Sequence, residues 1–202
     1  MNYPSVSIIF PTFNGWQDTK KCLESISNFD YPKERIEVIV VDNGSTDETV
    51  KKVQKSKFKD QNDKLKLKII ENRVNLGFAR AVNLGVKKSR GEYLLITNND
   101  VVFDKNYLAL LVEFLQNESL AGMVGGKVFY RSLKKKISFA GARFNFYTGL
   151  LRLGKYPNQT CQTDWVPGCN MLLRRQVWCQ IGGFDEKFFF YFEDLDLCLR
   201  AK

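Results

Sequence analysis

The chain has 202 residues, of which 44% are hydrophobic and 26% charged, and Lys and Arg outnumber Asp and Glu by nine. This length and composition fit one globular domain with a sizeable core, and they exclude a disordered chain. No apolar run approaches the ~20 residues that a membrane-spanning helix needs, and the five cysteines include no CxxC pair, which favours reduced thiols in the cytoplasm over disulfides or a zinc site.

The first half of the chain alternates short apolar runs with stretches of helical spacing. Buried strands are predicted at Val6–Phe10, Ile36–Val41, Leu67–Glu71 and Tyr93–Thr97. Helices are predicted where apolar residues recur at i, i+3, i+4 and i+7, as in Thr19, Cys22, Leu23 and Ile26, and again in Leu108, Leu111, Val112 and Leu115. Ser45 and Glu48 have the spacing of a capping box, which predicts a helix start directly after the second strand.

The second half of the chain is less regular. Strands or hairpins are predicted within Ala121–Tyr130, around Ile137–Ala140 and Phe144–Tyr147, and at Asn170–Arg174. Short helices are predicted at Arg175–Ile181 and Glu193–Lys202. The densest basic cluster, formed by Arg131 with Lys134, Lys135 and Lys136, is expected in an exposed loop.

Strands that alternate with helices predict an α/β fold with a mostly parallel sheet and helices on both of its faces. Ligands of such sheets bind beyond the carboxyl ends of the strands. The segments that follow the four predicted strands are PTFNG, DNGST, NRVNLGFAR and NND, and each is polar or rich in glycine. We therefore expect a binding site formed by these four segments.

Asp42 and Asn43 follow the second predicted strand. A carboxylate at this place can accept the N–H of a pyrimidine ring or bind a ribose hydroxyl. The alternative is that Asp42 only caps the following helix, a role that Ser45 is expected to fill. The sequence therefore favours a nucleotide contact.

Asn98, Asn99 and Asp100 follow the fourth predicted strand and offer hard oxygen ligands. Mg²⁺ or Mn²⁺ prefers such oxygens and takes one or two protein carboxylates plus substrate phosphates. Asn and Asp are also ordinary turn residues, so the place of this triplet after a buried strand is what favours a metal site at Asp100.

Glu193, Asp194 and Asp196 begin the last predicted helix, directly after the aromatic run Phe188–Phe192. Acidic residues in a first turn can simply complement the helix dipole. A carboxylate beside aromatic rings is also partly desolvated, which raises its basicity toward that of a general base. Because the chain contains no histidine, Asp194 and Glu193 are the best candidates for that role.

Asn75, Gly77 and Arg80 lie at the start of a helix that is predicted between the third and fourth strands. Gly77 permits a close backbone approach, and Arg80 could pair with a phosphate or a ribose, although a plain surface arginine is an equal alternative. The Gly-rich stretch Gly122–Val128 lacks the spacing and the Ser or Thr of a phosphate-binding loop.

Six stretches together resemble glycosyltransferase family 2, the inverting transferases of GT-A fold, and in particular its rhamnosyltransferase-like members. They occur in the family's order and cover nearly the whole chain. These stretches are SIIFPTFNG (7–15), VIVVDNGSTDET (38–49), ENRVNLGFARAVNLG (71–85), GEYLLITNND (91–100), DWVPGCNMLLRR (164–175) and GGFDEKFFFYFEDLDLCLRA (182–201).

The resemblance implies a role for each matching position. Residues that would hold the nucleoside, its ribose and the diphosphate are Pro11, Thr12, Phe13, Asn14, Asp42, Asn43, Asn75, Arg80, Asn98 and Asn99. Asp100 would bind the metal in this chain's version of the DxD motif, in which Asn98 replaces the first Asp. Asp194 would be the general base, and Trp165 and Gly168 would help line the sugar and acceptor pocket.

The resemblance also implies a substrate class and a location. We expect a three-layer GT-A domain spanning 1–202 and truncated at its C-terminus, because family members usually continue through further helices. The implied donor is a dTDP- or UDP-sugar, with dTDP-rhamnose suggested by the branch, and the acceptor is a glycan or a lipid-linked molecule. The expected setting is polysaccharide biosynthesis for the cell envelope, in the cytoplasm or at the cytoplasmic face of the membrane, with peripheral membrane contact permitted by the positive charge.

Two other classes of function fit the sequence less well. A sugar-phosphate nucleotidyltransferase would share the sheet and the metal, but it would need a basic, Gly-rich loop where this chain has PTFNGW. A non-catalytic nucleotide-binding fragment is the second alternative. Nucleic acid is not an expected partner, because no recognition motif accompanies the charge.

Overall fold

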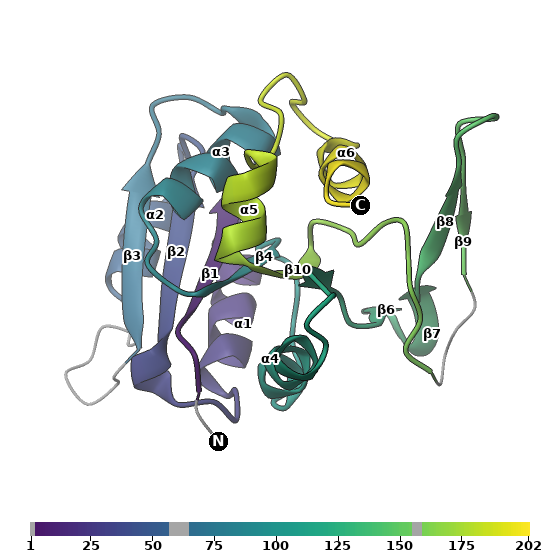
Figure 1. Ribbon diagram of the computed structural model, residues 1–202. Coiled ribbons are helices and arrows are strands. Elements are labelled where there is room, and N and C mark those ends of the chain that lie inside the picture. Colours follow the sequence, from purple (N-terminus) through teal and green to yellow (C-terminus); the bar gives the residue numbers. More distant parts are fainter. Residues whose placement is uncertain (1–2, 57–64, 155–158) are drawn as a thin grey trace.

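The computed structural model describes residues 3–56, 65–154 and 159–202, and in these residues a central sheet lies between two layers of helices (Figure 1). The sheet has the strand order β3-β2-β1-β4-β10-β5. Strands β1 to β4 are parallel, and β10 is antiparallel to both of its neighbours. The bounds are β1 Val6–Thr12, β2 Ile36–Asp42, β3 Lys66–Glu71, β4 Tyr93–Thr97, β5 Met123–Val124 and β10 Asn170–Arg174. The predicted α/β fold with a mostly parallel sheet is confirmed.

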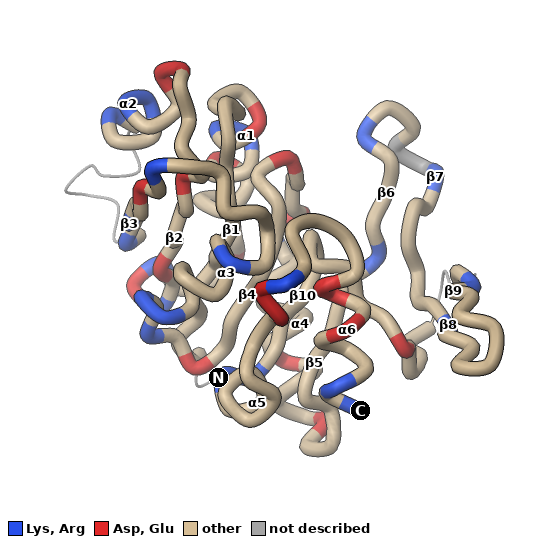
Figure 2. Tube along the Cα trace, turned by 90° about the horizontal axis from the view of Figure 1, so that it is seen from above, with Lys and Arg blue, Asp and Glu red and all other residues tan. Residues whose placement is uncertain are grey.

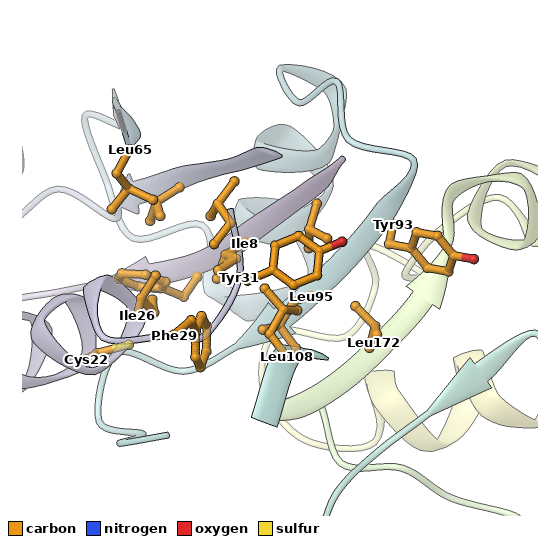
Figure 3. Close-up of a cluster of buried hydrophobic side chains, with 14 of the residues drawn as sticks. Ile8, Cys22, Ile26, Phe29, Tyr31, Leu65, Tyr93, Leu95, Leu108 and Leu172 are labelled. Carbon is orange, nitrogen blue, oxygen red and sulfur yellow. The ribbon is translucent and has the colours of Figure 1, made fainter. Parts of the chain in front are cut away.

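The helices divide between the two faces of the sheet according to the side chains that they bury. On one face, α1 (Trp16–Ser27), α2 (Thr49–Gln54) and α4 (Tyr107–Asn117) pack against Ile8 and other alternate residues of β1 and β2 (Figure 3). On the other face, α3 (Gly77–Lys87), α5 (Arg175–Ile181) and α6 (Glu193–Arg200) pack against Ile9, Ile39 and Val41. Successive side chains of a strand point to opposite faces, so continuous apolar strands supply both cores.

Two predictions about the first half of the chain were wrong. Strand β3 alternates exposed and half-buried residues, because it lies at the edge of the sheet with only β2 beside it. The helix after β2 begins at Thr49 and has no side-chain cap. Ser45 instead accepts a hydrogen bond from Asn14 N at 2.9 Å, so it ties two loops together and does not start a helix.

Four strands lie outside the main sheet. Strand β6 (Val128–Tyr130) pairs with β7 (Leu133–Phe139), and β8 (Ala142–Asn145) pairs with β9 (Leu150–Leu153). The expectation of a loop at the basic cluster was wrong, because Leu133–Phe139 pairs as a strand. The predicted strand at Phe144–Tyr147 is shifted, since Phe146 and Tyr147 form the turn of the second hairpin. Within the described residues, no helix has the length and apolar character needed to cross a bilayer.

A buried carboxylate, Glu37, joins four chain segments at the amino ends of the parallel strands. Glu37 accepts hydrogen bonds from Ser7 Oγ at 2.6 Å and from Arg90 N, and it pairs with Lys68 Nζ at 2.8 Å. Burial by itself raises the pKa of Glu37, but the bonds from Lys68, Ser7 and Arg90 outweigh it and hold the pKa below its ordinary value. The charged form therefore stabilises this end of the sheet.

The lowered pKa of Glu37 predicts an acid-sensitive contribution to stability. The contribution is present above the ordinary glutamate pKa and is lost as the pH falls through the lower pKa of the folded protein. We expect Glu37→Gln to lower the free energy of unfolding at pH 7 by about 1–3 kcal/mol and to flatten the fall of Tm below pH 5. Thermal unfolding followed by circular dichroism measures both, with the exposed Glu34→Gln as control. Equal acid profiles for the two variants would contradict this role.

Candidate functional site

The polar segments predicted from the sequence meet at one end of the sheet. Strands β1, β2 and β4 are parallel neighbours, so their carboxyl ends lie at the same edge, at the top of Figure 1. Thr12 is paired in register with Asp42. Helix α6 and the loop before it also lie at this end of the molecule.

Asp42 is a buried carboxylate that has one oxygen engaged and one without a partner. Its Oδ2 accepts hydrogen bonds from Gly44 N at 3.0 Å and Ser45 N at 2.9 Å. Its Oδ1 is buried and has no hydrogen-bond partner among the described residues. An unsatisfied buried acceptor is costly unless a ligand or a water satisfies it. Asp42 therefore holds its own loop in place and keeps one acceptor for a donor group.

The side chain of Asn43, in contrast, is used within the fold. Its Nδ2 donates to Gly77 O at 3.2 Å, and its Oδ1 accepts from Asn72 Nδ2 at 3.0 Å. Asn43 N also donates to Thr12 O at 2.8 Å. Asn43 thus connects the ends of β1, β2 and β3 to α3, and it shapes the site from beneath. Asn72 in this bridge was not singled out from the sequence, although it lies inside the stretch ENRVNLG.

The loop after β1 is fastened to the loop after β2. Asn14, at φ 49°, accepts hydrogen bonds on Oδ1 from Thr46 N at 2.8 Å and Asp47 N at 3.2 Å. Thr12 is buried, and its hydroxyl lies 2.9 Å from that of Thr19. Pro11 is half-buried at the end of β1, whereas the ring of Phe13 is about half exposed beside it. Of these four predicted residues, Phe13 offers the free surface.

The three residues after β4 have different environments. Asn99 donates from Nδ2 to Thr19 Oγ1 at 3.2 Å, to Thr12 Oγ1 at 3.4 Å and to Gly15 O at 3.4 Å, so its amide fastens the β1–α1 connection. Asn98 is half-buried, and its carbonyl faces the thiol of Cys22. Asp100 is exposed, and no hydrogen bond or ion pair within the described residues occupies its carboxylate.

The start of α3 is covered by the loop that leads to α6. Gly77, at φ 79°, donates a hydrogen bond from its N–H to Asn75 Oδ1 at 2.9 Å, and an added Cβ would collide with the carbonyl of Phe189. Arg80 points to the same loop, where its Nε donates to Glu186 O at 3.3 Å and lies 3.7 Å from the Glu186 carboxylate. Arg80 therefore already has a partner on this loop, which the sequence did not indicate.

Asp194 lies in the first turn of α6 and is held by the chain before β10. Its Oδ2 accepts a hydrogen bond from Gly168 N at 2.8 Å. Burial raises the pKa of Asp194, and the N–H groups of Gly168 and Trp165 offset part of that rise. The indole N–H of Trp165 makes no regular hydrogen bond within the described residues. It still lies near enough to the Asp194 carboxylate to lower its pKa.

Glu193, the neighbour of Asp194, is also buried. Its Oε2 has no hydrogen-bond partner in the described part of the chain. Burial raises the pKa of Glu193, and the adjacent charge of Asp194 adds to the rise. Two adjacent carboxylates therefore both hold protons more readily than usual, as a group that takes up a proton near neutral pH requires.

Cys169 connects the two halves of the site. Burial and the charges of Asp100 and Asp194 together raise the pKa of Cys169 to about 11. Its carbonyl accepts a hydrogen bond from Thr97 Oγ1 at 2.9 Å, at the end of β4. Asp100 and Asp194 are 94 residues apart in the sequence, and both lie close enough to one thiol to affect it. Cys169 was not predicted as a site residue from the sequence. Its position directly after Gly168 was the signal that could have identified it.

The residues present fit a hard divalent cation that a ligand helps to hold. Asp100 supplies an exposed and unoccupied carboxylate, and Asn98 and Asn99 flank it. No group of three or more His, Cys, Asp or Glu among the described residues could enclose an ion alone. Mg²⁺ and Mn²⁺ commonly take one or two protein carboxylates and complete their shell with substrate phosphates and water.

The chain is similar to known proteins in sequence and in fold. The family model described as glycosyl transferase family 2 matches residues 7–181. A probable glycosyltransferase, YdaM of Bacillus subtilis, is 28% identical over 201 residues, which are 98% of this chain and 46% of that protein. The chain thus spans about half the length of this curated relative.

Solved structures share the fold at low identity. The mannosyltransferase PcManGT of Pyrobaculum calidifontis, solved with GDP-Man and Mn²⁺, superposes with a TM-score of 0.73 at 22% identity, over 98% of this chain and 51% of that one. TarS residues 1–349 of S. aureus, solved with UDP-GlcNAc, superpose with a TM-score of 0.69 at 24% identity, over 98% and 53%. These similarities confirm a GT-A-like fold.

The position of Trp165 predicts a measurable effect on Asp194. We expect Trp165→Phe to raise the pKa of Asp194 further, because the indole N–H that lowers it is removed. A titration of the carboxyl carbons by ¹³C NMR measures this, with the Asp194 signal assigned from Asp194→Asn. Trp178→Phe, which alters a buried Trp in the core of α5, is the matched control and should leave the titration unchanged. An unchanged Asp194 pKa in Trp165→Phe would mean that the indole plays no part.

Proposed function

The chain belongs to glycosyl transferase family 2, and on that premise we propose that it is the catalytic domain of an inverting glycosyltransferase. It moves a sugar from a nucleoside-diphosphate sugar to a hydroxyl of a glycan or lipid-linked acceptor. The observation that carries the proposal is that Gly168 N binds Asp194 at 2.8 Å while Cys169 O binds Thr97 Oγ1 at 2.9 Å, at the end of the strand that leads to Asp100. One carboxylate is exposed and unoccupied and the other is partly buried, so the two suit different tasks.

Asp194 is the general base of the proposed reaction. Its raised pKa favours proton uptake, and the hydrogen bond from Gly168 N fixes the direction of its carboxylate. Asp194 takes the proton from the acceptor hydroxyl while that oxygen attacks the anomeric carbon on the face opposite the leaving diphosphate. A single displacement inverts the anomeric centre and needs no covalent sugar–enzyme intermediate. Glu193 is the second candidate for this role, because burial and the adjacent charge of Asp194 raise its pKa as well.

The nucleotide lies against the ends of β1 and β2 in this proposal. The free Oδ1 of Asp42 accepts an N–H of the base or a ribose hydroxyl, and the exposed ring of Phe13 covers one side. The loops that form this pocket are held by hydrogen bonds of Thr12, Asn14, Asn43 and Asn75. Pro11 lies beside them near the end of β1. Arg80 needs to leave Glu186 to reach a phosphate.

Asp100, with Asn98 and Asn99 beside it, would hold Mg²⁺ or Mn²⁺. Bound there, the ion would supply positive charge that stabilises the departing nucleoside diphosphate. The structure of PcManGT in complex with GDP-Man and Mn²⁺ supports this assignment for the present chain.

The donor sugar is open within this class. The resemblance to the rhamnosyltransferase-like branch suggests dTDP-rhamnose, whereas the structural neighbours were solved with GDP-Man or UDP-GlcNAc. Asp42 can accept a ring N–H from thymine, uracil or guanine, so it does not choose among these bases. A non-catalytic nucleotide-binding domain is the second candidate. Removal of the general base by Asp194→Asn distinguishes the two candidates.

The assignment of Asp194 predicts a selective loss of turnover. We expect Asp194→Asn to reduce sugar transfer, or hydrolysis of the donor by water, by about 10²–10⁴-fold, with donor binding retained. The control is Asp196→Asn in the same helix, where the carboxylate pairs with Arg200 at 2.7 Å. Kinetics and donor titrations on both variants measure the difference. Equal turnover in the two variants would remove Asp194 from the role of base.

The assignment of Asp100 predicts metal-dependent donor binding. In a thermal-shift panel of dTDP-rhamnose, UDP-GlcNAc and GDP-mannose with and without Mn²⁺, the true donor should raise Tm only when the ion is present. A free donor concentration of 100 times the Kd stabilises the folded protein by about 2.7 kcal/mol. Asp100→Asn should abolish the Mn²⁺-dependent part, and the exposed Asp104→Asn should keep it. A donor shift that Asp100→Asn leaves intact would place the ion elsewhere.

A further inference from the structure

The positive charge of this protein is concentrated in one part of the chain. Between Glu118 and Asp164 the sequence contains eight Lys and Arg and no Asp or Glu. The other 23 Lys and Arg nearly balance all 22 Asp and Glu of the chain. Almost the whole surplus of nine therefore comes from this one stretch, and the rest of the molecule is close to neutral.

The structure places this stretch in an arm that projects from the main body. We call residues 127–154, which contain β6 to β9, the basic arm. Its two hairpins form sheets of their own, apart from the six-stranded sheet, and they extend to one side of the molecule (Figure 1). Viewed from above, basic residues mark β6, β7 and the β8–β9 hairpin (Figure 2).

The β8–β9 hairpin also exposes large apolar side chains at its tip. Tyr147 is fully exposed, and Phe146 and Leu150 are 66% and 67% exposed. Leu153 is 53% exposed farther down the hairpin. Soluble surfaces rarely collect several such side chains on one projecting turn. Aromatic residues with basic neighbours are typical of segments that lie in the interface of a bilayer.

Two arginines face each other across the same hairpin. Arg143 and Arg152 are directly paired in the register of β8 and β9, and like charges in that relation destabilise a sheet. One acidic neighbour relieves part of this, since Arg143 lies 3.8 Å from Asp164. The remaining repulsion is relieved when an anion lies between or above the two guanidinium groups.

We propose that the basic arm docks this protein onto an anionic lipid surface. Phe146, Tyr147 and Leu150 enter the headgroup region, and Arg143 and Arg152 bind lipid phosphates. Lys136, which lies over the ring of Tyr130 on the neighbouring hairpin, adds to the attraction. Arg131 contributes less because it already pairs with Asp18 at 2.9 Å. The proposal does not rest on the glycosyltransferase activity.

A bilayer explains the arm better than a soluble polyanion does. An RNA or a phosphate-rich glycan could bind the basic residues, but an aliphatic side chain such as Leu150 gains nothing from contact with such a partner. A bilayer uses both features, because apolar side chains leave water and each nearby Lys or Arg gains attraction to anionic headgroups. The tip of the hairpin also rises toward the end of the molecule where the candidate site lies (Figure 1).

Co-flotation with vesicles tests the proposal on the 202-residue chain. We expect binding to vesicles of equal parts phosphatidylcholine and phosphatidylglycerol, little binding to phosphatidylcholine alone, and weaker binding as salt screens the charges. Arg143→Gln with Arg152→Gln should lower the partition coefficient roughly 25-fold, from about fivefold per charge. Phe146→Ser with Tyr147→Ser should weaken binding at low and at high salt alike, because salt does not screen the apolar contribution.

Matched controls remove the same chemistry from other surfaces. Lys51→Gln with Lys52→Gln in α2 removes two exposed charges, and Leu110→Ser with Leu120→Ser removes two exposed apolar side chains of or near α4. Both controls should retain binding, and circular dichroism checks that every variant is folded. The proposal would be overturned if a control lost as much binding as its counterpart, or if the protein did not bind anionic vesicles. It would also be overturned if the protein bound single-stranded RNA more tightly than vesicles and the Phe146 and Tyr147 substitutions left that binding unchanged.

Discussion

The hydrogen bond from Gly168 N to Asp194 Oδ2 holds the two halves of the candidate site together. Gly168 precedes β10, which pairs with β4, and Cys169 O is bonded in turn to Thr97 Oγ1 at the end of β4. These two hydrogen bonds therefore fix the first turn of α6 relative to β4. The other contacts of α6, such as the apolar contact of Leu197 and the bonds of Arg200 to Ile181 O and Gly183 O, do not touch the carboxylate of Asp194.

The same helix shows how environment gives different properties to identical side chains. Asp194 is desolvated and its pKa is raised, whereas Asp196, two residues on, forms an ion pair with Arg200. Glu193 is buried with one oxygen unpartnered, and Asp42 keeps a second such oxygen at the end of β2. Each buried and unsatisfied oxygen costs the fold about 1–3 kcal/mol. Such costs are typical of sites that await a ligand, whose groups satisfy them.

The carboxylates of the candidate site and most of the surplus positive charge lie in different parts of the molecule. The carboxylates of the candidate site lie at the carboxyl ends of the parallel strands, while the basic arm consists of hairpins that form sheets of their own. The basic arm, with seven Lys and Arg and no Asp or Glu, thus supplies most of the net charge of +9.

The sequence by itself determined the elements whose signals are local. Periodicity placed β4 and α5 at their observed bounds and put the polar residues after β1, β2 and β4, because parallel strands must end at one edge. Only the tertiary structure decided which polar side chains are free. Asn43, Asn99 and Arg80 have the same chemistry as ligand-binding groups, but contacts with Gly77, Thr19 and Glu186 occupy them. Those contacts join segments up to 106 residues apart, and side-chain pairing over such separations depends on how the layers pack, which no local pattern of residues encodes.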